Sequence, residues 1–125
     1  MTLHDWALIV AGIIGSGVAI LHGVLTQRLV VGPVSELART RVHPTIQRLL
    51  AGLMQFSTFN WFIGGLALIV AACAFGPEGR LATGVLVGSS YLFGAVGNLW
   101  ATRRWHPGWV LYTLALGLIA YGVGG

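Results

Sequence analysis

The sequence predicts an all-α integral membrane protein, an up-down four-transmembrane-helix bundle with a short interfacial helix between helices 1 and 2. Three observations support this fold class. Of the 125 residues, 56% are hydrophobic and 8% are charged, whereas soluble domains carry roughly 25% charged residues. The mean hydropathy is +0.83. Finally, the apolar residues fall into four long runs with polar or Gly/Pro-containing connections between them.

The whole chain, 1–125, is predicted to form a single transmembrane domain. A helix needs about 20 apolar residues to cross the hydrocarbon core, because its backbone polar groups have to be satisfied within the segment. Runs of this kind cover about 6–26, 46–75, 81–102 and 108–122, and the last is the shortest.

Two connections contain strong turn signals. Pro77 and the glycines on either side of it favour a tight turn after the second run, because Pro fixes its own φ while Gly tolerates positive values. Pro107 ends the third helix, since it cannot supply an interior helical hydrogen bond. The helices joined by these short connections are predicted to be antiparallel.

The longest connection, between the first and second runs, is predicted to contain the interfacial helix at about 33–42. Pro33 suits a first helical turn, and Val34, Leu37 and Ala38 follow at helical spacing. A short amphipathic helix of this kind is typical of the membrane interface.

Arginine positions predict the orientation of the bundle. The chain has no Lys, and only Arg80 lies in the second connection. Positive residues near helix ends remain on the cytoplasmic side. We therefore expect loops 1 and 3 to be cytoplasmic and both termini to lie on the opposite side, since the other arginines flank those two loops: Arg28, Arg39, Arg41, Arg48, Arg103 and Arg104.

Composition argues against several classes of function. The arginines flank apolar runs instead of forming a basic stripe, so we expect no nucleic-acid partner. A single Cys73 cannot form a disulfide framework, and the histidines show no i, i+4 pair on a helix, so we expect no metal and no cofactor. The absence of Lys excludes a retinal Schiff base. No carboxylate lies inside a predicted span, which argues against proton-coupled drug export.

Polar side chains within the predicted spans are the candidate functional residues, since they are costly in hydrocarbon unless they face the bundle interior. Several of them lie at a similar depth, one to two turns from the cytoplasmic arginines. Others lie nearer the middle of the second helix. We predict that together they line a ligand-binding site: His22, Gln55, Asn60, Trp61, Asn98 and Tyr112.

Two classes of function follow from this layer. The first is a non-catalytic protein that binds a lipid-like or amphipathic small molecule in the cytoplasmic-leaflet half, or serves as an accessory subunit. The second is a membrane enzyme that acts on a lipophilic substrate, with His22 as acid or base. A simpler alternative is that the polar side chains only hydrogen-bond one another. Anionic groups or headgroups are expected to contact Arg28, Arg41, Arg48, Arg103 and Arg104.

The stretch from Arg39 to Gln47 resembles the Arg-rich entry to the second helix in the membrane-associated eicosanoid and glutathione metabolism superfamily, which is similar in length, helix number and orientation. This resemblance implies glutathione-transferase-like activity on a lipophilic substrate. The family's motif continues with an Asn and a Glu where this chain has Thr45 and Arg48, and its third helix carries a thiolate-stabilising Arg where this chain has Gly97-Asn98. These departures remove the groups that would lower the pKa of a bound thiol.

A closer resemblance covers nearly the whole chain. Leu21-His22-Gly23, the segment 27–33 and the segment 103–109 are similar to motifs in a group of small four-helix bacterial inner-membrane proteins of unassigned function. The resemblance implies a bacterial inner membrane, with periplasmic termini, and implies no reaction. Members often carry Trp-His where this chain has Met54-Gln55. Membrane lipids are the expected partners, and a homo-oligomer or a larger membrane complex remains open.

Overall fold

The computed structural model describes residues 1–125 and contains helices joined by turns, without strands, so the all-α class is confirmed. α1 (Leu3–Thr26), η1 (Gln27–Val31) and α2 (Gly32–Ala38) follow one another without interruption and are succeeded by α3 (Pro44–Ala74), α4 (Pro77–Thr102) and α5 (Pro107–Gly122). The segments Leu3–Ala38, Pro44–Ala74 and Pro77–Thr102 are long and apolar enough to cross a membrane. α5 has 16 residues.

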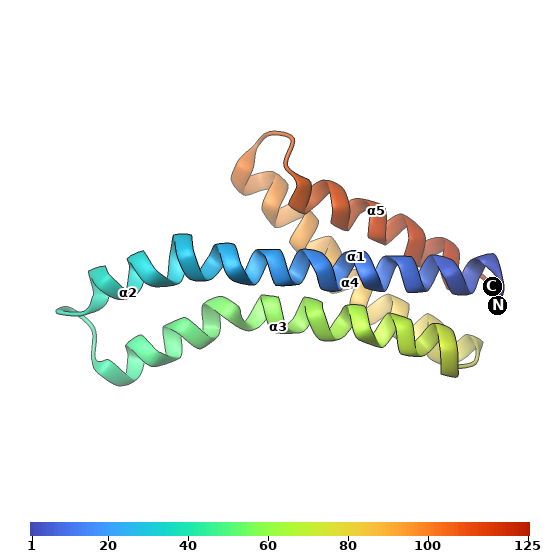
Figure 1. Cartoon of the computed structure of the whole chain (residues 1–125), viewed down its shortest axis with the longest axis horizontal. Coiled ribbons are helices and arrows are strands. Elements are labelled where there is room, and N and C mark those ends of the chain that lie inside the picture. The colour runs from blue at the N-terminus through green and yellow to red at the C-terminus, as the bar shows by residue number, and fades with distance from the viewer.

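The helices form an up-down bundle in which α1 packs against α3 and α5, and α4 packs against both of the same helices. Figure 1 shows both chain termini at one end of the bundle. At the other end, the hairpin of α2 and the start of α3 projects beyond the connection between α4 and α5 (Figure 1).

The prediction of a separate interfacial helix at 33–42 is wrong in its boundaries and in its separation from the first helix. α2 continues the first helix through the π-helical turn η1 and ends at Ala38. Pro33 does not break the helix, because it stands directly after that turn, in which the Gly32 N–H bonds to the Gln27 carbonyl oxygen. A π-turn shifts the hydrogen-bonding pattern locally and allows the helix to continue.

Local sequence explains where the helices begin. Thr2 caps α1 through a capping box with Asp5. α3 and α5 begin with the same device: His43 and His106 each precede a Pro, and each ring Nδ1 accepts a hydrogen bond from the second backbone amide beyond it, at 3.2 and 3.0 Å. The proline adds no unsatisfied donor at this position.

An ion pair closes the end of the bundle that carries the termini. The Arg80 guanidinium pairs with the Asp5 carboxylate, and it also donates to the carbonyl oxygens of Ala72 (2.7 Å) and Phe75 (3.0 Å). The Asp5 side chain is 11% exposed. Arg80 therefore ties the beginning of α4 to the beginning of α1 and the end of α3.

Candidate functional site

Four aromatic side chains meet inside the bundle at the level of the predicted site. The Tyr91 and Tyr112 rings stack with centroids 4.8 Å apart, and Trp61 meets Tyr112 edge-on at 5.0 Å. His22 meets the other edge of this group, 4.8 Å from the Trp61 ring. The cluster joins the four long helices of the bundle, because its members come from α1, α3, α4 and α5.

Hydrogen bonds and glycines fix the aromatic cluster in place. The Tyr91 hydroxyl donates to the Trp61 carbonyl oxygen (3.1 Å), and the Trp61 Nε1 donates to the carbonyl oxygen of Ser90 (3.2 Å). Gly15 leaves room for the Tyr91 ring and Gly94 leaves room for the indole. Close helix approach at small residues is typical of membrane bundles.

Beside this cluster lies a cavity of about 260 Å³, which we call the histidine cavity. Its polar lining comes from His22 on α1, Asn98 on α4, Tyr112 on α5 and His106 in the connection before α5. Its other walls are mainly apolar and come from α1 and from the beginning of α5: Val18, Leu21, Leu25, Pro107, Gly108 and Leu111.

The polar groups of the histidine cavity retain hydrogen-bonding capacity. His22 Nε2 lies 3.2 Å from the Thr26 hydroxyl and 3.3 Å from the Ser57 hydroxyl, while its Nδ1 makes no hydrogen bond within the protein. The Asn98 amide nitrogen donates to the Gly94 carbonyl oxygen at 2.7 Å, which leaves the Asn98 Oδ1 without a hydrogen bond.

Tyr112 is the polar residue that α5 contributes to the cavity lining. The residue is fully buried, and its hydroxyl has no hydrogen-bond partner in the protein. Buried hydroxyls are normally satisfied, whereas this one is enclosed by protein atoms without a hydrogen bond. No Asp, Glu or Arg lines the cavity, and its chemistry therefore suits an uncharged head group that both donates and accepts hydrogen bonds.

Replacing Tyr112 by Phe should leave the free energy of unfolding unchanged or raise it by up to about 1 kcal/mol, because the hydroxyl that is removed makes no protein hydrogen bond. Tyr91→Phe is the matched control. It removes a hydroxyl that donates to the Trp61 carbonyl oxygen and should cost about 1 kcal/mol. Denaturation of both variants in mixed micelles measures the difference, and an equal loss in both would contradict this account of Tyr112.

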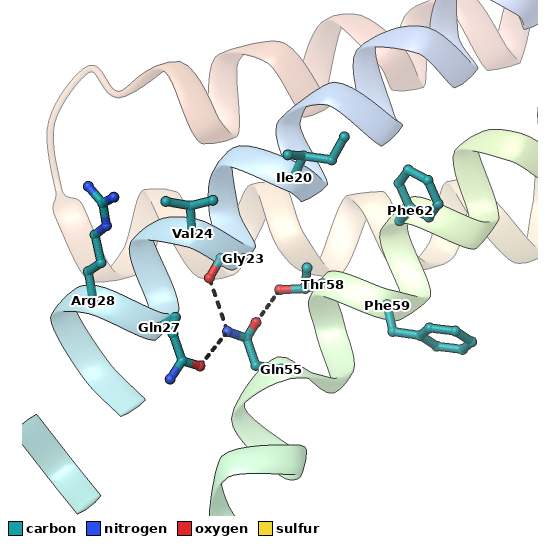
Figure 2. Close-up of a pocket in the computed structure, with 9 residues that line it drawn as sticks. All are labelled: Ile20, Gly23, Val24, Gln27, Arg28, Gln55, Thr58, Phe59 and Phe62. Carbon is teal, nitrogen blue, oxygen red and sulfur yellow. Dashed lines mark hydrogen bonds between the residues drawn. The ribbon is translucent and has the colours of Figure 1, made fainter. Parts of the chain in front are cut away.

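Gln55 lies in a different place, in an open groove of about 620 Å³ between α1 and α3 (Figure 2). Its amide nitrogen donates to the carbonyl oxygen of Gly23 (3.0 Å) and to the side-chain oxygen of Gln27 (3.3 Å), while its own oxygen accepts from Thr58 (2.9 Å). Ile20, Val24, Phe59 and Phe62 form the apolar part of this groove, and Arg28 also lines it.

Asn60 occupies a third place, on the outer surface between α3 and α4, where its Oδ1 accepts from the Ser90 hydroxyl at 2.7 Å. The predicted residues therefore do not form one layer. His22, Asn98 and Tyr112 share the histidine cavity, and Trp61 packs behind it, whereas Gln55 and Asn60 face away from it. The reason is that a helix presents only one face to the bundle interior. In α3 that face carries Trp61, Gly65 and Leu68.

The predicted anion-binding arginines are also distributed. Arg28 lines the outer groove, and the other four are exposed at the end of the bundle opposite the termini: Arg41, Arg48, Arg103 and Arg104. Sequence reasoning assigned no role in the site to Ser57, Thr26 or His106. The i, i+4 spacing of His22 and Thr26 was an available signal, whereas Ser57 and His106 meet the site only through tertiary packing.

No family model, curated protein or solved structure matches the chain.

Proposed function

We propose that this chain is an integral membrane protein of the bacterial inner membrane, with periplasmic termini and with loops 1 and 3 in the cytoplasm. The outer surface of the bundle supports this placement, since it exposes large apolar side chains such as Phe56, Leu86 and Phe93, each more than 60% exposed. Large apolar side chains exposed in this number are unfavourable in water.

The charge distribution supports the same placement. Arg80 is the one arginine at the end that carries the termini, and its charge is compensated by Asp5. At the opposite end, Arg39 pairs with Glu36 on the surface, and the remaining arginines have no acidic partner within ion-pair distance. Arginines without an acidic partner are therefore confined to the end proposed to be cytoplasmic, as expected for membrane proteins.

Within this placement, the proposed function is non-catalytic binding of an amphipathic small molecule with an uncharged head group. The observation that carries it is the histidine cavity, in which His22 and Asn98 from two helices carry free hydrogen-bonding atoms beside apolar walls. Sites of this composition hold the polar end of a ligand by a few directed bonds and its remainder by apolar contact.

The volume of the cavity indicates which part of the ligand it would enclose. About 260 Å³ lies just below the range of roughly 300–1,000 Å³ for sites that enclose a whole drug-sized ligand. Leu21 and Leu25, at the rim, are 54% and 40% exposed. The head group would lie inside against His22, while the apolar tail would leave between α1 and α5.

Replacing His22 by Ala is expected to reduce ligand retention at least several-fold, because it removes a free ring nitrogen and one wall of the cavity. The protein is purified with native lipids, and co-purifying molecules are identified and quantified by mass spectrometry. Asn98→Leu should act in the same direction. Gln55→Leu is the matched control, since Gln55 lies in the outer groove, and it should leave retention unchanged.

Thermal denaturation establishes that each variant is folded before retention is compared. If a ligand is retained equally by wild type, His22→Ala and Asn98→Leu, the histidine cavity is not its site. If it is lost only from Gln55→Leu, the outer groove is the site instead. Wild-type protein that retains nothing beyond bulk lipid would leave the accessory-subunit role and overturn the binding proposal.

A further inference from the structure

Asn60 is exposed halfway along α3, among the exposed apolar side chains of Phe56, Phe59 and Ile63. It lies 16 residues after the first residue of α3 and 14 before the last. Its side-chain oxygen is satisfied by Ser90, but its amide nitrogen makes no hydrogen bond within the protein. Within the proposed membrane placement, two N–H donors therefore face hydrocarbon, where an unsatisfied polar group costs several kcal/mol.

The surface around Asn60 contains a hollow and a projection side by side. The hollow has a volume of about 220 Å³ and lies between α3 and α4, with Phe56, Asn60, Ser90 and Phe93 among its lining residues. Phe93 is 79% exposed, so its ring projects from the rim. We call this region the asparagine face.

We propose that the asparagine face is the contact between two copies of this chain, related by a twofold axis, in which each Asn60 amide donates to an acceptor on the other copy. Acyl chains offer no acceptor, and the ester and phosphate oxygens of lipids lie outside the hydrocarbon core, so lipid does not satisfy this amide. Asn side chains hydrogen-bond across packed helices in membranes.

The same face supplies the shape that a twofold contact requires. In an isologous interface, one surface patch has to be complementary to itself. Here a projecting ring, Phe93, stands next to a hollow large enough to accept an aromatic side chain. In the proposed contact the ring of each copy would enter the hollow of the other, whose lining includes Asn60.

The native cysteine provides a direct test. Cys73 is the only cysteine and is exposed on α3, so the full chain can be labelled there with donor or acceptor fluorophores and mixed in phosphatidylethanolamine–phosphatidylglycerol vesicles. Energy transfer at increasing lipid-to-protein ratio gives the dissociation constant. Asn60→Leu is expected to raise it on the order of tenfold, because two symmetry-related hydrogen bonds are lost.

Thr113→Val is the matched control, since Thr113 is an exposed hydroxyl residue on α5 whose side chain bonds to the Trp109 carbonyl oxygen of its own helix. It should leave the dissociation constant unchanged. Phe93→Ala removes an exposed ring that is not part of the core, so it should weaken association without unfolding the chain.

Three results would overturn the proposal: wild type without energy transfer at any lipid ratio, association unaffected by both Asn60→Leu and Phe93→Ala, or equal weakening by Thr113→Val. Occupation of the face by a different membrane protein would give the first of these results. The inference depends on the membrane placement but not on ligand binding. His22→Ala should leave the dissociation constant unchanged, which separates a failure of this proposal from a failure of the histidine cavity.

Discussion

Replacing Arg80 by Gln is expected to lower the thermal midpoint of unfolding by on the order of 10 °C, the largest effect of any single substitution proposed for this chain. The substitution leaves the Asp5 carboxylate, which is 11% exposed, without its ion partner. It also removes the donors to the carbonyl oxygens of Ala72 and Phe75. Loss of one member of a shielded ion pair is costly because the remaining charge stays desolvated.

A double-mutant comparison identifies the cause of this loss. Asp5→Asn combined with Arg80→Gln should be more stable than Arg80→Gln alone, because no unpaired charge remains. Arg39→Gln is the matched control, since its pair with Glu36 is 71% and 70% exposed, and surface pairs contribute little. Circular dichroism melts in detergent measure all four proteins. Equal midpoints for Arg80→Gln and Arg39→Gln would contradict the structural role given to Arg80.

Replacing Gly65 by Ala is expected to lower the free energy of unfolding by about 2 kcal/mol, in the range of overpacked cores. A methyl carbon there would lie 2.6 Å from the Gly12 carbonyl oxygen and 2.8 Å from the Ser16 amide nitrogen. Both obstacles are backbone atoms of α1, so they can yield only if the two helices separate. Gly12→Ala should have a similar effect, since a methyl carbon at Gly12 would clash with the backbone carbonyl oxygen of Gly65.

Gly17→Ala provides the control for this pair on the same helix. A Cβ at Gly17 meets nothing within 4 Å, so this variant should be neutral or more stable by up to about 1 kcal/mol, the difference between Gly and Ala in a helix interior. Unfolding titrations in mixed micelles supply the free energies. If Gly17→Ala destabilises as much as Gly65→Ala, helix flexibility and not the α1–α3 contact explains the glycines.

Hydrophobic run length and turn chemistry were sufficient to predict the all-helical class and the apolar runs that form α1, α3, α4 and α5. The sequence predicts that Pro77 and Pro107 lie where one helix ends and the next begins. Both stand in the first turn of the following helix. The continuation through η1 could not be predicted in the same way. Pro33 is compatible with the first turn of a new helix and equally with a helix that continues after a π-turn, and only the backbone hydrogen bonds distinguish the two.

The site was predictable only in part, because helix depth and helix rotation are different quantities. Distance along the chain placed His22 and Asn98 at one level, and the structure brings both to one cavity. Gln55 lies at a comparable level but is rotated into the outer groove, and Asn60 is turned outward altogether. The rotation of α3 is set by the fit of Trp61 against Gly94 and of Gly65 against Gly12, which are contacts between distant segments.

Within the proposed membrane placement, the shortness of α5 has a consequence for the surrounding bilayer. Sixteen residues reach about 24 Å along the helix axis, against a hydrocarbon thickness of roughly 30 Å, and adjacent lipid adapts to such a mismatch by thinning. The rim at Leu21 and Leu25 lies beside the first turns of α5, so a local dip would bring water and lipid carbonyls down toward it. The proposed amphiphilic ligand would then enter sideways from the leaflet with its head already near His22.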